Sequence, residues 1–142
     1  MLQIWHNEKF LDFEKYKYDD VSIVYLPEDQ FRAVAYVKSD DLSYGFEATQ
    51  NIDEPWINNP YVIPFSEIGR YRSTSVGDVI KRSCNGLEEW FIVMPVGFKP
   101  FKFLESVEQA YAIFNEPARL GGNLRTLIKY IGYEYFKEKG DM

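Results

Sequence analysis

The chain has 142 residues, with 16 Lys and Arg against 22 Asp and Glu, for a formal net charge of −6. This length predicts a single domain, and the 46% share of hydrophobic residues excludes a wholly disordered chain. A single His and a single Cys exclude an intrachain disulfide and leave too few ligands for a zinc site of the usual kind.

The first third of the chain predicts three β-strands. Residues 2–5, 21–26 and 31–37 are short runs rich in β-branched and aromatic side chains, which is typical of strands. Residues 27–30 predict a turn, so we expect the second and third strands to pair as an antiparallel hairpin. The stretch 6–20 shows no regular spacing of apolar residues and predicts a loop with one short element.

A helix is expected after this hairpin. Ser39 is the expected N-cap, and Asp40 and Asp41 follow it at the positive end of the helix dipole. Apolar side chains recur at helical spacing from Leu42 onward. We expect the helix to end near Asn51, because two prolines follow.

The segment after the helix predicts a loop, an edge strand and a polar connection. Residues 55–60 form the loop, with Trp56 as an expected buried anchor. Residues 61–65 predict an edge strand, because Pro64 has no N–H for a second neighbouring strand. Residues 66–75 form the polar connection.

A β-hairpin is expected next. A strand begins within residues 76–80, residues 83–86 turn the chain, and residues 89–96 return. The turn contains an Asn-Gly pair, which is the strongest short signal for a hairpin. Residues 97–100 are expected to end the sheet.

The rest of the chain changes to a helical pattern. Residues 106–114 predict one short helix, and Asn123 is expected to cap a last helix that has one apolar stripe. The predicted fold class is α+β: a mainly antiparallel, strongly curved or barrel-like sheet with one inserted helix and a C-terminal helical pair. We expect the sheet over residues 1–103, with the helical extension over 104–142 packed on it in one compact domain.

The negative charge is concentrated in the first part of the chain. Residues 1–60 have a net charge of −7, residues 61–104 of +2 and residues 105–142 of −1. An acidic surface repels a nucleic-acid backbone, and it suits either a partner with a basic groove or plain solubility. The lone Cys84, the absence of a signal-peptide pattern and the lack of an apolar run of about 18 residues lead us to expect a soluble, cytoplasmic protein without membrane contact.

Two segments carry a resemblance to a group of proteins. The first is ATQNIDEPW at residues 48–56, and the second is RSTSVGDVI at residues 72–80, followed by Trp90 and a Gly-Phe pair. Their order resembles a family of small, uncharacterised proteins of tailed phages and related mobile elements, over residues 30–98 of this chain. The resemblance implies a phage origin and expression in the host cytoplasm, and it implies no catalytic activity.

The most polar and basic stretch of the chain lies before the second hairpin. Two arginines beside three hydroxyls are able to bind a phosphate or carboxylate, because Arg makes bidentate contacts and hydroxyls donate. In the structural alternative, the hydroxyls cap turns and the arginines pair with acidic neighbours. The candidate anion-site residues are Arg70, Arg72, Ser73, Thr74 and Ser75. Asp78 is expected either to ligate a metal or to accept backbone amides in its turn.

Amide and tyrosine side chains give a second set of candidate contacts. Gln50 and Asn51 either contact a ligand base or peptide, or cap the helix end and hold the loop that follows. Tyr44 is a candidate for a contact surface, because Tyr is enriched at protein interfaces. His6 and Cys84 lack the partners of a recognisable catalytic arrangement, so neither predicts an enzyme.

The aromatic residues divide into two predicted groups. The expected core aromatics are Trp5, Trp56, Trp90, Phe91 and Phe98. The tyrosines expected at the surface are Tyr16, Tyr18, Tyr44, Tyr130 and Tyr133. Their mainly acidic neighbours in the first half argue against single-stranded nucleic acid as a partner.

These observations favour a non-enzymatic phage accessory protein, with no cofactor and no metal, that binds a host protein, for instance to inhibit a host defence system. Two alternatives stay open. One is a module that binds a nucleotide signal or another small anion through the arginine and hydroxyl stretch. The other is a structural or virion-associated phage protein.

Overall fold

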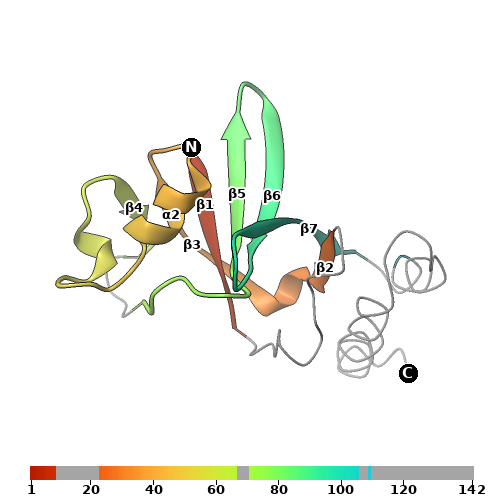
Figure 1. Cartoon of the computed structure of the whole chain (residues 1–142), viewed down its shortest axis with the longest axis horizontal. Helices are drawn as coiled ribbons and strands as arrows, with labels where there is room; N and C mark the ends of the chain where they lie inside the picture. The colour runs from red at the N-terminus through yellow and green to blue at the C-terminus, as the bar shows by residue number, and fades with distance from the viewer. Residues whose placement is uncertain (9–22, 67–70, 106–108, 110–142) are drawn as a thin grey trace.

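The computed structural model describes residues 1–8, 23–66, 71–105 and 109, and these form a mixed α+β fold (Figure 1). The strands are β1 Leu2–Asn7, β2 Val24–Pro27, β3 Phe31–Val37, β4 Val62–Pro64, β5 Val79–Cys84, β6 Leu87–Val93 and β7 Phe98–Leu104. The other elements given bounds are the helix α2 Leu42–Ala48 and the 3-10 turns η2 Glu28–Gln30 and η3 Trp56–Asn58.

The strands form one seven-stranded sheet in the order β2-β7-β6-β5-β1-β3-β4. Neighbouring strands run antiparallel, apart from β2 and β7, which pair in parallel. The prediction of a mainly antiparallel sheet with an inserted helix is therefore confirmed. The sheet is open, since the described strands β2 and β4 lie at its two edges.

The predicted β5–β6 hairpin is confirmed, and it extends beyond the rest of the sheet (Figure 1). Asn85 and Gly86 have φ values of 53° and 81°, the left-handed conformation that a two-residue turn between twisted strands requires. Both strands reach closer to the turn than expected, because β5 runs to Cys84 and β6 begins at Leu87.

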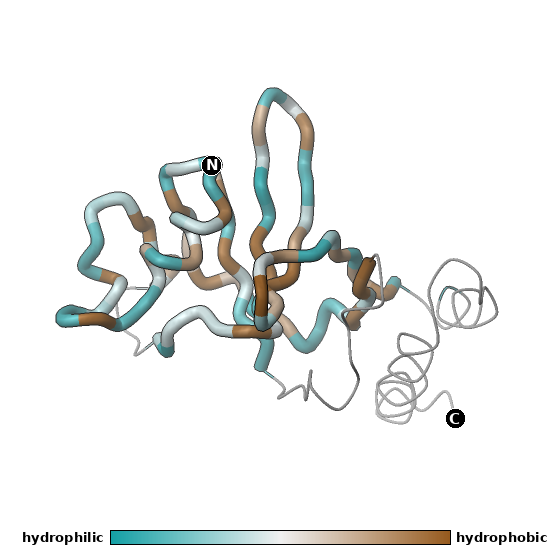
Figure 2. Tube along the Cα trace, in the orientation of Figure 1, coloured by the Kyte–Doolittle hydropathy of each residue, from teal (hydrophilic) through white to brown (hydrophobic). Residues whose placement is uncertain are grey.

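The core on one face of the sheet lies beneath α2. Leu2 and Ile4 of the central strand β1 are fully buried there. The helix packs so closely that a Cβ added at Gly45 would lie 2.5 Å from Cδ1 of Leu2. A glycine in the middle of this helix therefore permits its approach to the sheet. Figure 2 shows hydrophobic stretches along the central strands.

The predicted hairpin between the second and third strands is wrong. β2 pairs with β7, whereas β3 lies between β1 and β4. Residues 28–30 lack the Gly or Asn of a tight hairpin turn and instead form η2, in which the N–H of Phe31 donates to the carbonyl of Glu28. Phe31 then packs on Phe101 and Phe103 of β7, with ring centroids 5.5 and 5.6 Å away.

The prediction that residues 97–100 end the sheet is also wrong, because β7 begins at Phe98. Gly97 has a φ of 74°, and its carbonyl accepts the N–H of Met94, so the chain reverses here. Pro100 lies within β7, opposite Phe91 of β6. Sequence reasoning missed the strand because Gly97, which precedes it, and Pro100 within it favour a turn when neighbouring strands are unknown.

The predicted helix forms as α2, with a different cap and an earlier end. The N-cap is Asp41 rather than Ser39, since the Asp41 carboxylate accepts two backbone N–H groups of the first turn. The Ser39 hydroxyl instead accepts the N–H of Asp41. The helix ends at Ala48, because Asn51 bonds to a distant segment rather than continuing the helical pattern.

The predicted edge strand is confirmed as β4. On the side that faces β3, the N–H of Phe65 donates to the carbonyl of Val34, and the N–H of Lys38 donates to the carbonyl of Tyr61. The N–H of Val62 donates locally to the carbonyl of Asn59. Pro64 has no N–H to offer at this edge.

Burial of the aromatic residues follows the prediction in part. Trp56 is buried, with 2% of its surface exposed. The other predicted core aromatics are half-buried: Trp5, Trp90, Phe91 and Phe98. Tyr44 is half-buried as well. The remaining tyrosines predicted at the surface lie outside the described residues: Tyr16, Tyr18, Tyr130 and Tyr133.

The predicted C-terminal helical pair lies outside the described residues, apart from Gln109. Most of the predicted loop over 6–20 lies outside them too. In the part of the chain that the structure describes, no helix has the length and apolar character needed to cross a membrane.

Candidate functional site

The two segments that carry the sequence resemblance lie against each other. The side-chain amide of Gln50 donates to the carbonyl of Thr74 over 2.8 Å. The backbone N–H of Asn51 donates to the Ser73 hydroxyl over 2.8 Å, and its side-chain amide donates to the carbonyl of Tyr71 over 2.9 Å. The amides at the helix end thus hold the loop that follows, which is the structural alternative considered for them.

Arg72 is bound by the buried carboxylate of Asp78. Its Nη1 and Nη2 donate to the two carboxylate oxygens over 2.6 and 2.7 Å, and this pairing raises the pKa of Arg72. The guanidinium also donates to the carbonyls of Asn7 and Ser73. Asp78 accepts the backbone N–H groups of Asn7 and Ser75, so it acts as the predicted acceptor of backbone amides.

His6 belongs to the same buried cluster. Its Nε2 lies 3.0 Å from the Thr74 hydroxyl and 4.0 Å from a carboxylate oxygen of Asp78. Burial is the main cause that lowers the pKa of His6 from 6.5 to about 4, with Arg72 and Arg32 lowering it further and Asp78 opposing them. The imidazole is therefore neutral at pH 7. The Thr74 side chain beside it is buried, so a substrate has no access to this hydroxyl.

The structure gives different surroundings to the residues of the predicted anion site. Arg70 lies outside the described residues. Thr74 is buried, the Ser73 hydroxyl accepts a backbone N–H, and the donors of Arg72 are directed at groups within the chain. Ser75 is exposed and donates its backbone N–H to the same cluster. In this arrangement Arg72, Ser73, Thr74 and Ser75 take part in hydrogen bonds that stabilise a loop, and anion binding by the predicted set stays a prediction.

A cleft of about 590 Å³ lies between α2 and η3. Of the predicted contact residues, Tyr44 and Gln50 line it. The carboxylate and aromatic residues in its lining are Tyr44, Glu47, Asp53, Glu54, Trp56 and Tyr61. The cleft therefore combines negative charge with aromatic rings.

The lining of the cleft favours a cation. Glu47, Asp53 and Glu54 are exposed, and no Lys or Arg is among the described lining residues. The rings of Tyr44 and Tyr61 lie edge to face, with centroids 6.3 Å apart and planes at 82°. Carboxylates attract a positive charge, and the faces of tyrosine rings attract one as well.

The loop after α2 contributes Asp53 and Glu54 to the cleft lining. Asp53 has a φ of 64°, an uncommon conformation for a residue other than Gly and one that Asp tolerates better than most. Ile52 and Glu54 on either side of it form an isolated β-bridge. The chain thus reverses at Asp53, which lies at the tip of the loop that follows α2.

Sequence reasoning missed Glu47, Asp53, Glu54 and Tyr61 as site residues. The available signal was the net charge of −7 over residues 1–60. A charge sum does not show which carboxylates share a surface. The reversal at Asp53 and the position of η3 decide that, and both depend on contacts with a distant part of the chain.

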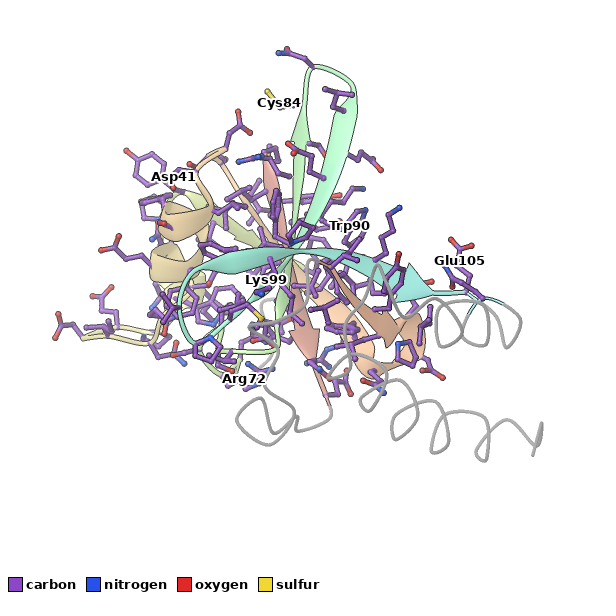
Figure 3. All side chains as sticks on the ribbon, turned by 45° about the vertical axis from the view of Figure 1, so that its right-hand side comes forward. Asp41, Arg72, Cys84, Trp90, Lys99 and Glu105 are labelled. Carbon is purple, nitrogen blue, oxygen red and sulfur yellow. The ribbon has the colours of Figure 1, made fainter. Side chains whose placement is uncertain are left out.

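No other constellation of catalytic or metal-binding type is present in the described part of the chain. Cys84 is exposed near the tip of the β5–β6 hairpin, far from Arg72 and its buried cluster (Figure 3). Among the described residues, no group of three or more His, Cys, Asp or Glu is placed to hold a metal ion. Comparisons with models of protein families, with curated proteins and with solved structures give no match to this chain.

Proposed function

We propose that this chain is a non-enzymatic accessory protein that binds a positively charged segment of a partner protein in the cleft between α2 and η3. The observation that carries the proposal is the cleft lining, with three carboxylates, two tyrosine rings and no Lys or Arg among its described residues. A Lys or Arg side chain fits both features, because its charge pairs with carboxylates and its cation lies favourably on a tyrosine ring.

The size of the cleft suits a side chain together with part of a peptide backbone. Its volume of about 590 Å³ falls within the range of roughly 300–1,000 Å³ that is usual for ligand pockets. Ile52 in the lining has 68% of its surface exposed and offers an apolar contact beside the carboxylates. A segment with a basic residue next to an apolar one would use the whole surface.

The partner that we propose is a host protein, with this chain acting in the host cytoplasm as a product of a phage or mobile element. The two motifs at residues 48–56 and 72–80 support this origin by resemblance. The excess of acidic residues in the first 60 residues supports a basic partner. A host defence protein that acts on nucleic acid carries a basic groove, and covering that groove would inhibit it.

The scaffold in this proposal is the strongly curved, barrel-like sheet expected from the sequence. Its support is the short connection η2, which joins strands at the first and sixth places of the sheet order. Ring contacts between Phe31 of β3 and Phe101 of β7 add to that support. A curved sheet leaves the α2 side, and with it the cleft, on an outer face.

The direct test titrates the full chain with a short fluorescent peptide rich in Lys and Arg, read by anisotropy at several salt concentrations. We expect binding that weakens as salt rises. The E47Q/D53N/E54Q variant should bind roughly tenfold or more weakly, because it removes the charges that attract the cation. Asn at position 53 suits the positive φ, so this variant should keep the loop conformation.

A control variant separates the cleft from the overall charge. E28Q/E88Q/E105Q makes the same change in net charge at exposed positions outside the cleft lining, and it should bind the peptide as the wild type does. Equal weakening in both triple variants would assign binding to the general charge and contradict the proposal. Salt-independent binding would contradict it too.

The proposed host partner is tested by capture from host-cell extract followed by mass spectrometry. A protein retained by the wild type and by the control variant, and lost from the cleft variant, is the partner that the proposal requires. Proteins retained equally by all three chains would show that partner binding occurs outside the cleft.

A further inference from the structure

We propose that Arg72 is a positioning residue for the cleft, although it does not line it. Held on Asp78, Arg72 fixes the 71–75 segment, and that segment fixes the 50–56 loop, which forms one wall of the cleft. The inference rests on the proposed function, since it concerns how the same cleft is kept in shape. The proposal gives Arg72 a role in cation binding at a distance, and anion binding at Arg72 stays a separate prediction.

The 50–56 loop has little backbone support of its own. Its backbone–backbone hydrogen bonds are all short-range: Gln50 donates to Glu47, Ile52 to Gln50 and Glu54 to Ile52, and the carbonyls of Pro55 and Trp56 accept within the η3 turn. Gln50, Ile52 and Glu54 all belong to the cleft lining. A loop with short-range bonds alone would be free to change shape, so its conformation depends on contacts with another part of the chain.

The 71–75 segment supplies those contacts. Hydrogen bonds reach it from the side chain of Gln50, from the backbone and side chain of Asn51 and from the indole of Trp56. Thr74 adds a backbone bond in the other direction, from its N–H to the carbonyl of Thr49. The acceptors on the segment are mostly backbone carbonyls, so their positions depend on the path of its backbone.

Trp56 is the most direct link between the segment and the cleft. Its indole N–H donates to the carbonyl of Arg72 over 2.9 Å, and its backbone N–H donates to the Asn51 side chain over 2.9 Å. Its ring packs on Tyr71, with centroids 5.0 Å apart. Trp56 is also one of the residues that line the cleft. A displacement of the Arg72 backbone therefore moves an acceptor on which the Trp56 indole depends.

Arg72 is the anchor because its guanidinium joins this segment to the sheet. The Asp78 carboxylate that it binds comes directly before β5, and the carbonyl of Asp78 accepts the N–H of Val93 at the end of β6. The two parallel N–H donations from Arg72 to Asp78 need a planar guanidinium, which Lys does not have. Removing them frees the segment from its fixed point.

The experiment compares full-length R72K and R72M with the wild type. R82M is the matched control, because Arg82 also makes two donations to a carboxylate, that of Glu89, but on the β5–β6 hairpin away from the cleft. One readout is hydrogen exchange of the Trp56 indole N–H, followed by NMR and assigned with W56F. The second is affinity for the Lys- and Arg-rich peptide. Both are measured well below the melting temperature of each variant, and the exchange of buried backbone amides of β1 is the reference for a general loss of stability, which would speed both kinds of exchange alike.

We expect R72K to speed exchange of the Trp56 indole N–H roughly tenfold or more. We expect it to weaken binding of the peptide by a similar factor, because charged hydrogen bonds are lost. R72M should have the larger effect, and R82M should match the wild type. If R72M does not fold, R72K alone decides the result.

The outcomes for the two proposals can be told apart. If exchange of the Trp56 indole N–H is unchanged in R72K, the positioning role is overturned, whether or not the affinity for the peptide changes. Faster exchange with unchanged peptide affinity overturns it as well, because the cleft then does not depend on the anchor. A wild type that binds no peptide contradicts the proposed function, while the indole exchange still reports whether Arg72 holds the 50–56 loop.

Discussion

Arg72 illustrates, at the scale of single residues, that a side chain's role depends on the groups it meets. Its side chain is 45% exposed, yet its donors are directed at a carboxylate that is 1% exposed. A surface ion pair contributes little, whereas a buried carboxylate that loses its partner is strongly destabilising. The pairing with Asp78 is therefore expected to matter more than the exposure of Arg72 suggests.

The free energy of unfolding of the protein should decrease as the pH is lowered, because His6 is buried in its neutral form. Its pKa is about 4 in the folded state against 6.5 when unperturbed, so the unfolded chain binds the proton more readily. The stability contributed by neutral His6 is complete above pH 6.5 and is lost as pH falls from there toward 4. Urea unfolding should show a loss of roughly 2 kcal/mol between pH 7 and pH 5.

The control for this prediction is His6→Gln, which removes the only histidine of the chain. This variant should be less stable than the wild type at pH 7, because the flexible Gln side chain replaces a buried ring that packs on Trp56. Its stability should be nearly level between pH 7 and pH 5. A decline as steep as that of the wild type would assign the pH dependence to other groups.

At the scale of elements, α2 depends on its N-cap because it is so short. Asp41→Ala removes the carboxylate that accepts the N–H groups of Ser43 and Tyr44, and it should lower the free energy of unfolding by about 1 kcal/mol. Ser39→Ala is the comparison. It should lower the free energy of unfolding by only a few tenths of a kcal/mol, because the Ser39 hydroxyl accepts the N–H of Asp41, outside the helix. Equal losses in thermal or urea unfolding would refute the assignment of the cap to Asp41.

The strands could be predicted from the sequence better than their pairing could. Alternation and β-branched residues locate β1, β3 and β4, and the Asn-Gly pair locates the turn between β5 and β6. The partner of β2 could not be predicted, because it is β7, more than half the chain away. β7 itself was missed because Gly97 and Pro100 favour a turn locally, whereas Phe101 is buried by tertiary contacts.

The candidate site was predictable only in part, for a similar reason. Residue type predicted Tyr44, Gln50 and Asn51 as contact residues, and Tyr44 and Gln50 line the cleft. The carboxylates of the cleft are ordinary surface residues until Asp53 reverses the loop. Hydrogen bonds between segments more than 20 residues apart fix that loop, and no local pattern announces them.

At the scale of the whole molecule, Phe31 joins the two flanks of the sheet. It is 8% exposed, and its ring contacts Phe101 and Phe103 across the sheet. Phe31→Ala should lower the free energy of unfolding by about 3–5 kcal/mol, a large part of the roughly 5–15 kcal/mol that a domain has. Urea unfolding followed by both circular dichroism and tryptophan fluorescence measures this loss.

Phe65→Ala is the matched comparison for that prediction. Phe65 is 45% exposed, and among the described residues its ring packs on Tyr36, with centroids 5.0 Å apart. Its loss should cost about 1 kcal/mol or less, as for most surface positions. Comparable losses in the two variants would show that β3 and β7 do not support each other through Phe31.

The prolines at the edges of the sheet affect how copies of this protein behave when crowded. β4 offers an incoming strand no free N–H at Val62 or Pro64, and β2 ends at Pro27. A second copy therefore finds no N–H donor at these two positions of β4 with which to extend the sheet. A partner that docks at β4 must therefore recognise side chains rather than add a strand to the sheet.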